Sequence, residues 1–395
     1  MKDELELTVL MPCLNEAATL ATCIHKAQGS IARLGVNAEI IVADNGSLDG
    51  SRQIAESAGA RVVPVDEKGY GSALFHGSVA ARGRFIIIAD ADDSYDFGQL
   101  DPYLKKLRDG YDLVMGNRFT GGISPDAMPW KNRYIGTPVL SFLGRLFFKA
   151  PIADFNCGMR GYSRRAFELM DLQTTGMEFA SEMIIKATLL KLRIAEVPTT
   201  LRKDGRTREP HLRPWRDGWR HLRFMLMYSP RWLFLYPGLL LMIVGGATGL
   251  LLLPGPIPLT EHVGLDVHTL LFAFAAVLIG FQAVSFAAFA RIYALSEGLL
   301  PVDPILNRMF KTFTLEVGLV VGALLLLGGF AGAMVAVLRW SQVGFGGLDA
   351  RMMLRTAIPS ATAICLGAQI ILTSFLLSLL GLRTRARSTS AHRQA

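Results

Sequence analysis

The residues best suited to chemistry are two aspartates, Asp90 and Asp92, which directly follow the apolar run at residues 84–89. Side chains at positions i and i+2 of an extended segment project to the same side, so both carboxylates can face one ligand. Two hard oxygen donors suit Mg²⁺ or Mn²⁺, and the same ion would bridge a diphosphate. The alternative is an acidic turn that caps the following helix. Because the pair follows a buried strand, we favour the metal site.

A second polar group, residues 44–51, follows the apolar run at residues 39–43. Its Asn-Gly pair predicts a tight turn, and Asp49 is suited to cap the next helix. Asp44 is the functional candidate, as a carboxylate that accepts a hydrogen bond from a base N–H or a ribose hydroxyl. A turn with a cap explains the other residues without a ligand, but it explains Asp44 less well.

A glycine-rich stretch at residues 68–74 is a candidate phosphate loop. It is not a Walker A loop, and it lacks the third glycine of the dinucleotide-binding fingerprint. Glycines at positions 69 and 71, before a helix, still permit a ligand to approach the backbone closely.

The domain that positions these residues alternates strand-like and helix-like runs over residues 5–200. Strands are expected at residues 7–11, 39–43, 60–63 and 84–89, and helices at 16–34 (capped by Asn15), 49–58 and 72–81. Apolar strands that alternate with helices predict an α/β fold with a parallel sheet covered on both faces. Ligands bind at the carboxyl ends of the strands in such sheets, which is where the candidate aspartates stand.

The rest of the chain differs in composition. Of the 395 residues in the whole chain, 51% are hydrophobic and 19% are charged, whereas an average domain has about 25% charged residues. Four apolar stretches, near residues 232–253, 269–290, 315–338 and 358–382, each exceed the roughly 20 residues needed to span a membrane. Residues 212–231 mix arginine with tryptophan and phenylalanine, which favours an interfacial helix over a soluble amphipathic one.

The charge pattern predicts an orientation. The net charge is +8, yet residues 232–380 carry six basic and six acidic side chains, and residues 383–395 carry four arginines. The positive-inside rule places both termini in the cytoplasm, in a cell or inner membrane. One loop spoils the pattern, because Arg339, Arg351 and Arg355 would face outward. The sequence has no basic patch with stacking aromatics, so we expect no nucleic-acid partner.

The four cysteines form no Cys-x-x-Cys pair, and residues 1–6 contain no apolar signal sequence. Scattered thiols of this kind fit a reducing compartment, which agrees with a cytoplasmic catalytic domain.

Together and in this order, the motifs resemble glycosyltransferase family 2. Residues 9–16 are similar to that family's first strand and nucleotide loop, residues 44–51 to its Asp-x-Gly-Ser segment, residues 69–83 to its glycine-alanine run and residues 90–92 to its metal motif. The resemblance covers residues 7–230. It implies a nucleotide-sugar-binding domain of GT-A type, with a Rossmann-like, mostly parallel sheet, followed by an all-α transmembrane domain of about four helices. The implied nucleotide-sugar contacts are Pro12, Asn15, Glu16, Asp44, Lys68, Gly69, Asp90 and Ala91.

Within that family the chain is most similar to polyprenyl-phosphate hexose synthases of the dolichol-phosphate mannose or glucose type. The segment around Arg118 resembles one whose arginine contacts the lipid phosphate, and Arg133, Thr137 and Arg202 fall at positions for further contacts. The sequence departs from the pattern at two places. Ser94 replaces a glutamine, so we expect water or Asp93 to complete the metal coordination, and Thr207-Arg208 replaces a Ser-Lys pair.

Together with the apolar stretches and the charge pattern, the resemblance predicts a cytoplasmic domain at residues 1–211, an interfacial helix at 212–231, a membrane domain at 232–382 and a basic tail at 383–395. It also implies an inverting enzyme that moves a hexose from a nucleotide sugar to a polyprenyl phosphate, with Mg²⁺ or Mn²⁺ as cofactor. Expected catalytic residues are Asp92, Arg118 and Glu182.

Glu178 and Glu182 share a helix face at spacing i, i+4, and one of them is a candidate general base, although an anionic acceptor needs none. Three alternatives stay open. They are a polysaccharide synthase, a transferase to a glycolipid or protein hydroxyl with Glu182 or Asp154 as base, and an inactive membrane binding or transport protein. A homo-oligomer is compatible with each.

Overall fold

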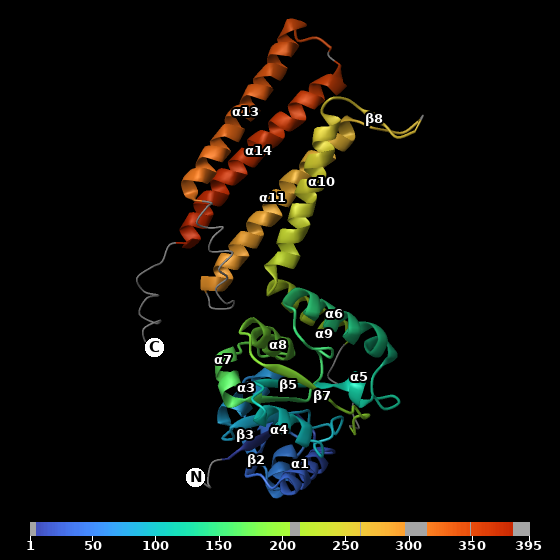
Figure 1. Cartoon of the computed structure of the whole chain (residues 1–395), viewed down its shortest axis with the longest axis vertical. Helices are drawn as coiled ribbons and strands as arrows, with labels where there is room; N and C mark the ends of the chain where they lie inside the picture. The colour runs from blue at the N-terminus through green and yellow to red at the C-terminus, as the bar shows by residue number, and fades with distance from the viewer. Residues whose placement is uncertain (1–4, 206–213, 261, 297–313, 348, 382–395) are drawn as a thin grey trace. The chain divides into compact units, whose positions relative to one another are not determined.

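The computed structural model describes residues 5–205, 214–260, 262–296, 314–347 and 349–381. The chain divides into two units, Met1–Met227 and Tyr228–Ala395, and each is described by itself. The first combines strands and helices, and the second is mainly helical (Figure 1). The basic tail at residues 383–395 and the pair Thr207 and Arg208 lie outside the described residues.

The first unit is built on a sheet of strand order β3-β2-β1-β4-β6-β5-β7. Strands β1, β2, β3 and β4 pair in parallel, as do β5 and β7, whereas β6 runs antiparallel to β4 and β5. The predicted α/β fold with a mostly parallel sheet is confirmed. The strands are β1 (Leu7–Cys13), β2 (Ala38–Asp44), β3 (Arg61–Pro64), β4 (Phe85–Ile88), β5 (Leu113–Asn117), β6 (Arg160–Ser163) and β7 (Ile194–Pro198).

Helices cover both faces of this sheet. Two successive residues of β6 face opposite sides of the sheet and meet different helices. An added Cβ on Gly161 would meet Leu107 of α4, whereas the Tyr162 hydroxyl lies 2.6 Å from Ser78 of α3. The helical segments are α1 (Leu20–Leu34), α2 (Ser51–Ser57), α3 (Tyr70–Ala80), α4 (Asp101–Arg108), α5 (Arg118–Gly121), η1 (Asn132–Gly136), α6 (Thr137–Phe148), α7 (Arg164–Met170), α8 (Phe179–Leu189) and α9 (Pro214–Met227).

The start of α1 differs from the prediction. The helix begins at Leu20 rather than at residue 16, and Asn15 does not cap it but adopts a left-handed conformation with φ of 60°. The reason is a competing set of partners, because the Ala17 N–H donates to Asp49 at 2.9 Å and the Asn15 side chain accepts from Leu48. The loop after β1 is thus tied to the loop after β2.

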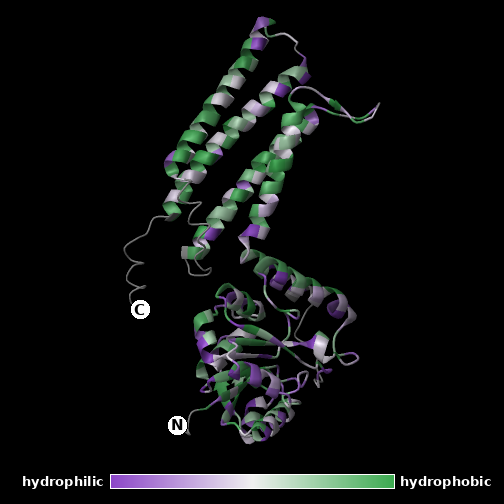
Figure 2. Ribbon diagram, viewed as in Figure 1, coloured by the Kyte–Doolittle hydropathy of each residue, from purple (hydrophilic) through white to green (hydrophobic). Residues whose placement is uncertain are grey.

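Among its described residues, the second unit has four helices that are long and apolar enough to span a membrane, as the composition predicts. Candidate spans are Arg231–Leu252, Val267–Leu295, Leu315–Gln342 and Ala350–Leu380, and Figure 2 shows hydrophobic residues along all four. The elements are η2 (Arg231–Leu235), α10 (Tyr236–Leu252), β8 (Ile257–Pro258), β9 (Gly264–Leu265), α11 (Val267–Ser296), α13 (Leu315–Gln342) and α14 (Ala350–Gly381).

Glycines let these helices approach one another closely, as is common in membranes. A Cβ on Gly280 of α11 would lie 2.5 Å from the Gly238 carbonyl of α10. In the same way, a Cβ on Gly367 of α14 would lie 2.6 Å from the Gly322 carbonyl of α13. The unit therefore consists of two tightly packed helical pairs.

Two of the three arginines that break the charge rule are paired with one acid. Arg355 forms an ion pair with Asp266 and donates to the Leu252 carbonyl, and Arg351 lies 3.5 Å from the other Asp266 oxygen. The side chains of Arg355 and Asp266 are only 14% and 19% exposed. The third, Arg339, donates to Thr356 at 3.4 Å. Part of the unexpected positive charge is thus neutralised inside the unit.

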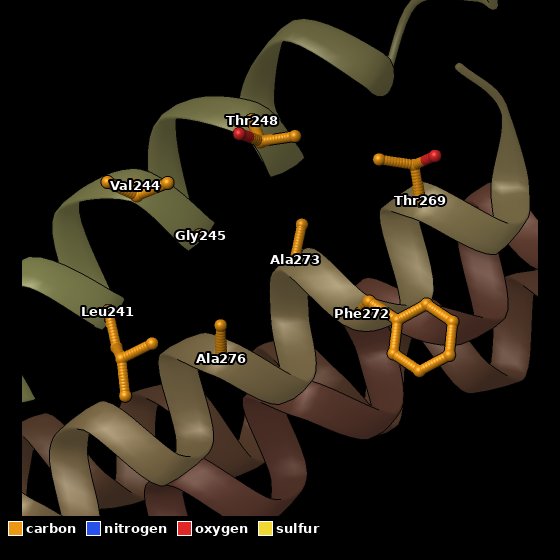
Figure 3. A pocket seen from close by; sticks show the side chains of 8 residues that line it. All are labelled: Leu241, Val244, Gly245, Thr248, Thr269, Phe272, Ala273 and Ala276. Carbon is orange, nitrogen blue, oxygen red and sulfur yellow. The ribbon is translucent and has the colours of Figure 1, made fainter. Parts of the chain in front are cut away.

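A cavity of about 220 Å³ opens between α10 and α11 (Figure 3). Its lining is apolar apart from two threonines and consists of Leu241, Val244, Gly245, Thr248, Thr269, Phe272, Ala273 and Ala276. None of the residues predicted for catalysis lines it, so the candidate site must be sought in the first unit.

The cysteines are all unpaired. Cys13, Cys23 and Cys157 are buried in the first unit, and this burial raises the pKa of the first thiol to about 11 and of the other two to about 12. Cys365 of α14 is exposed.

Candidate active site

The aspartate pair stands at the carboxyl end of β4, as predicted. Asp92 is 6% exposed, and one of its oxygens accepts hydrogen bonds from the N–H and hydroxyl of Ser94 at 3.0 and 2.5 Å. Asp90 is half-buried and accepts a hydrogen bond from the Tyr70 hydroxyl. Asp93 turns elsewhere, since its carboxylate lies 2.6 Å from Lys26. Whether water or Asp93 replaces the missing glutamine in the metal coordination stays a prediction.

This donor set fits a divalent ion that is shared with a substrate. Among the described residues, no group of three or more His, Cys, Asp or Glu side chains forms a complete metal cage. Mg²⁺, however, usually keeps several waters and is held by one or two carboxylates together with substrate phosphates. Burial and the nearby Asp90 raise the pKa of Tyr70 well above its usual value, so its hydroxyl stays protonated and donates to that carboxylate.

Asp44 is fully buried at the end of β2, and its carboxylate is engaged by its own loop. It accepts from the N–H groups of Gly46 and Ser47 at 3.1 and 3.2 Å and from the Arg52 guanidinium. Burial raises the pKa of Asp44, but the hydrogen bonds from Ser47 and Arg52 outweigh it, so the net pKa is lowered and the group is ionised. The turn therefore accounts for Asp44 here, and its contact with a nucleotide stays a prediction.

Asn45 joins the two predicted nucleotide segments, and the sequence analysis missed it. Its side-chain oxygen accepts from the Gly69 N–H at 2.8 Å, its amide donates to the Glu67 carbonyl at 2.7 Å, and its own carbonyl accepts from Lys68 at 2.8 Å. The Asn-Gly pair predicts only a turn, because the loop that Asn45 contacts lies 22 to 24 positions further along the chain. The predicted nucleotide-sugar residues lie at the carboxyl ends of β1, β2 and β4, in the loops that follow β1 and β4, and in the loop before α3. They are Pro12, Asn15, Glu16, Asp44, Lys68, Gly69, Asp90 and Ala91.

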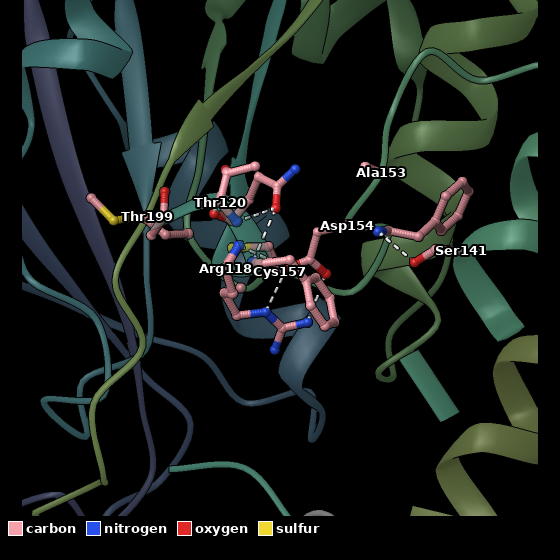
Figure 4. Close-up of polar contacts among 12 residues, drawn as sticks. Arg118, Thr120, Ser141, Ala153, Asp154, Cys157 and Thr199 are labelled. Carbon is pink, nitrogen blue, oxygen red and sulfur yellow. Dashed lines mark hydrogen bonds and ion pairs between the residues drawn. The ribbon is translucent and has the colours of Figure 1, made fainter. Parts of the chain in front are cut away.

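Arg118 begins α5, directly after β5, and is held by a buried acid (Figure 4). Its Nε and Nη2 atoms each lie 2.7 Å from an oxygen of Asp154, and both residues are buried. Burial lowers the pKa of Arg118, but Tyr95 and Asp154 outweigh it and raise the pKa, so the guanidinium is charged. Glu196 in turn accepts from the N–H groups of Ala153 and Asp154 at 2.8 and 2.9 Å. The arginine is thus fixed by two successive carboxylates.

The other predicted phosphate contacts have partners of their own. Arg202 lies 3.0 Å from Asp96, and the Arg133 guanidinium lies over the Tyr134 ring at 5.6 Å. The Arg202 N–H also donates to the Ser94 carbonyl at 2.8 Å, so this arginine adjoins the aspartate loop. That Arg118, Arg133 and Arg202 converge on one phosphate stays a prediction.

Arg133 and Thr137 stand on η1 and α6, a segment with one buried and one apolar exposed face. The buried face packs on Phe155, whose N–H donates to Ser141 at 3.1 Å, and a Cβ on Gly144 would lie 2.5 Å from the Phe155 ring. With Trp130 just before η1, the exposed face carries apolar side chains that are 39–68% exposed, beside the exposed Arg145. They are Trp130, Tyr134, Ile135, Val139, Phe142 and Leu146. Contiguous apolar patches on a protein surface commonly mark interaction sites.

This second amphipathic segment was not predicted from the sequence, which indicates an interfacial helix only at residues 212–231. That region does form a helix, α9, with Trp219 exposed and Met225 buried. Its location at a membrane surface stays a prediction.

Of the three carboxylates proposed as general bases, Glu178 is half-buried, whereas Asp154 and Glu182 are buried and engaged by other residues. Asp154 is saturated by Arg118, and Glu182, also 0% exposed, accepts from Gln173 and Thr174 and pairs with Lys186 at 3.0 Å. Neither one presents an accessible oxygen to an acceptor hydroxyl.

Solved structures similar to this chain include glucosyl-3-phosphoglycerate synthase from Mycobacterium tuberculosis. One of these, in complex with phosphoglyceric acid, has a TM-score of 0.44 and 23% identity and covers 57% of this chain and 80% of its own. Another, with 22% identity, contains Mn²⁺, uridine diphosphate and glucosyl-3-phosphoglycerate.

Among relatives of known name, the low-salt glycan biosynthesis hexosyltransferase Agl6 of Haloferax volcanii is 36% identical over 380 residues, which cover 95% of this chain and 89% of the relative. The dolichyl-phosphate hexose transferase of the same organism is 30% identical over 214 residues, 54% of this chain and 89% of the relative. Residues 8–170 match the model of glycosyl transferase family 2, and residues 288–381 match that of the glycosyltransferase family 2 C-terminal transmembrane region. The chain therefore belongs to glycosyltransferase family 2 and is a hexosyltransferase with a C-terminal membrane domain.

Proposed function

We propose that this hexosyltransferase uses a nucleotide sugar as donor and a polyprenyl phosphate as acceptor. The observation that carries the proposal is the η1–α6 segment, where Arg133 and Thr137 share a short helical stretch with an exposed apolar face. An amphipathic helix of this kind lies in a membrane interface. A cation on it would then stand at the depth of lipid headgroups, where a lipid phosphate presents its charge.

On the donor side, Asp90 and Asp92 would hold Mg²⁺ or Mn²⁺ against the diphosphate. When bound, the ion neutralises the charge that develops on the departing nucleoside diphosphate. Lys68 and Asn45 close the opposite side of the same loop cluster through their 2.8 Å hydrogen bond.

The transfer is a single displacement. An oxygen of the lipid phosphate attacks the anomeric carbon, and the bond from that carbon to the nucleoside diphosphate breaks, so the configuration inverts. The phosphate is already ionised, so no general base is needed, whereas a hydroxyl acceptor would require one. The engagement of Asp154 and Glu182 by other side chains supports the phosphate acceptor over a hydroxyl. The name of the dolichyl-phosphate hexose transferase, a relative at 30% identity, supports the same choice.

The proposed arrangement in the cell follows from the charge pattern. Residues 1–211 and both termini are cytoplasmic, α9 lies in the interface, and the four spans cross a cell or inner membrane, with the β8–β9 ribbon on the far side.

The test is a transfer assay with the full-length protein in lipid vesicles. Radiolabelled UDP-glucose, GDP-mannose and UDP-N-acetylglucosamine are each supplied with undecaprenyl phosphate, and product is extracted into organic solvent. Undecaprenol, which differs only by lacking the phosphate, is the matched acceptor. We expect one donor to label the lipid phosphate and none to label the alcohol. Labelling of the alcohol, or of water-soluble glycan alone, would refute the lipid-phosphate acceptor.

A further inference from the structure

The carboxylate of Glu182 on α8 lies at the centre of a polar cluster that the proposed reaction does not use. It accepts from the backbone N–H of Gln173 at 3.0 Å and from the N–H and hydroxyl of Thr174 at 2.8 and 2.7 Å. Lys186, one helical turn later, lies 3.0 Å from the same carboxylate and donates to the Asp171 carbonyl. All the partners of Glu182 named here are donors, so a negative charge at this position is what holds the preceding segment against α8.

That segment, residues 171–176, packs directly on the glycine-rich loop at residues 68–72. The Thr175 carbonyl accepts a hydrogen bond from the Ser72 N–H at 3.0 Å. This N–H belongs to the first turn of α3, where an unpaired donor would otherwise be available to a phosphate. A segment of the chain itself therefore occupies the position that the phosphate-loop interpretation assigned to a ligand.

The two glycines of the loop are explained by the same contact. A Cβ on Gly71 would lie 2.5 Å from the Thr174 carbonyl, and a Cβ on Gly69 would overlap the Thr175 carbonyl. Gly69 also has a φ of 143°, which residues with a side chain rarely adopt. Any larger residue at either position would push residues 68–72 away from residues 171–176.

The loop at residues 68–72 carries two groups into the candidate donor site. The Tyr70 hydroxyl bonds to the metal-pair residue Asp90, and the Lys68 amine donates to the Asn45 carbonyl. Whatever fixes this loop therefore fixes one wall of the site.

We infer that Glu182 is a positioning residue for the nucleotide sugar and not a general base. The Glu182 carboxylate holds residues 171–176 in place. Residues 171–176 in turn hold the loop at residues 68–72, which positions Lys68 and Tyr70. The inference rests on the proposed function for the identity of the donor, and it predicts an effect on donor binding with none on the acceptor.

The experiment measures equilibrium binding of labelled UDP and GDP to the full-length protein with Mg²⁺, and separately KM for each substrate. The variants are Glu182→Gln, which keeps the shape but loses the charge, Glu182→Asp, which keeps the charge, and Thr174→Val, which removes one donor. Glu168→Gln, an exposed carboxylate of α7, is the matched control. Melting curves report whether each variant folds.

We expect Glu182→Gln to weaken binding of the nucleotide and to raise donor KM about tenfold, the order expected when hydrogen bonds to a buried charged group are lost. Thr174→Val should weaken nucleotide binding and raise donor KM by a smaller factor. Glu182→Asp should bind the nucleotide more tightly than Glu182→Gln but less tightly than the wild type. Acceptor KM and the pH profile of kcat should match the wild type, as should every parameter of Glu168→Gln.

Unchanged nucleotide binding in Glu182→Gln, together with a lower kcat and loss of the acidic limb of its pH profile, would overturn the inference and restore the base. If Glu182→Gln does not fold, Thr174→Val decides, and wild-type donor binding in that variant overturns the inference. A wild-type protein that binds neither nucleotide contradicts the proposed donor instead, so the two failures are distinguishable.

Discussion

At the scale of single residues, acids that lie close together in the sequence have different partners in the structure. Asp92 uses one oxygen for Ser94, whereas Asp93 is paired with Lys26 and Asp154 is saturated by Arg118. Neighbouring acids of the same type thus have different uses. Spacing in the sequence cannot separate them, because each use depends on a partner that is distant in the chain.

The aspartate pair leads to a paired prediction. Asp92→Asn should abolish transfer without unfolding the protein, because asparagine still offers an oxygen to Ser94 but lacks the anionic metal donor. Asp93→Asn should leave transfer intact, since asparagine tolerates the left-handed conformation of Asp93 at φ of 61°. Turnover is measured against Mg²⁺ and Mn²⁺ concentration and with EDTA. Turnover that persists in EDTA would refute the metal site.

Arg118 and Arg133 should respond differently to substitution. Arg118→Ala leaves Asp154 buried without its cation, and breaking such a pair costs about 3–5 kcal/mol, so its Tm should fall markedly. Arg133 is half-buried and contacts an exposed ring. Arg133→Gln should therefore keep the wild-type Tm and raise acceptor KM roughly tenfold, as expected for a lost charge-assisted hydrogen bond. Wild-type KM for polyprenyl phosphate in this variant would remove Arg133 from the acceptor site.

At the scale of elements, the sheet and the four spans were predictable because hydrophobic period and length report burial directly. The ends of the helices were harder to predict. The apolar pattern of α1 extends back to residue 16, but Ala17 gives its N–H to Asp49 in another loop and the helix starts later. The exposed apolar face of α6 was not predicted because the buried face contains small residues such as Ser141 and Gly144. The sequence pattern therefore marks the outward side as the core side.

The exposed face of α6 can be tested by adding charge to it. Phe142→Glu should lower transfer to polyprenyl phosphate in vesicles at least several-fold, because a carboxylate opposes insertion among lipid chains. Binding of UDP or GDP should not change. Leu169→Glu, at an exposed apolar position of α7, is the control and should transfer sugar normally. Equal activity of both variants in vesicles would exclude this face as a membrane contact.

At the scale of the whole molecule, the charge pattern conflicts less with the proposed membrane orientation once ion pairs are counted. Arg351 and Arg355, in the first turns of α14, share Asp266, so this end of the helix carries less unpaired positive charge than its arginine count indicates. The sequence shows the distribution of charges but not this ion pair, because Asp266 lies 89 positions from Arg355.

Reporter fusions test the orientation. A reporter at Ala395 and one between β8 and β9 should report opposite sides of the membrane, with Ala395 in the cytoplasm. Both on one side would refute the four-span arrangement. Asp266→Asn should leave the two results unchanged but lower thermal stability, because two arginines lose their counter-ion.

The burial of three thiols makes the protein a convenient substrate for chemical mapping. Alkylating reagents attack the thiolate, and Cys13, Cys23 and Cys157 have pKa values of about 11 to 12 and no access to solvent. Replacing Cys365 by serine should therefore yield a folded chain that a maleimide does not modify until it is denatured. New cysteines introduced singly at Leu259, Tyr134 or Phe142 would then each report the accessibility of one position against no background, from either side of a sealed vesicle.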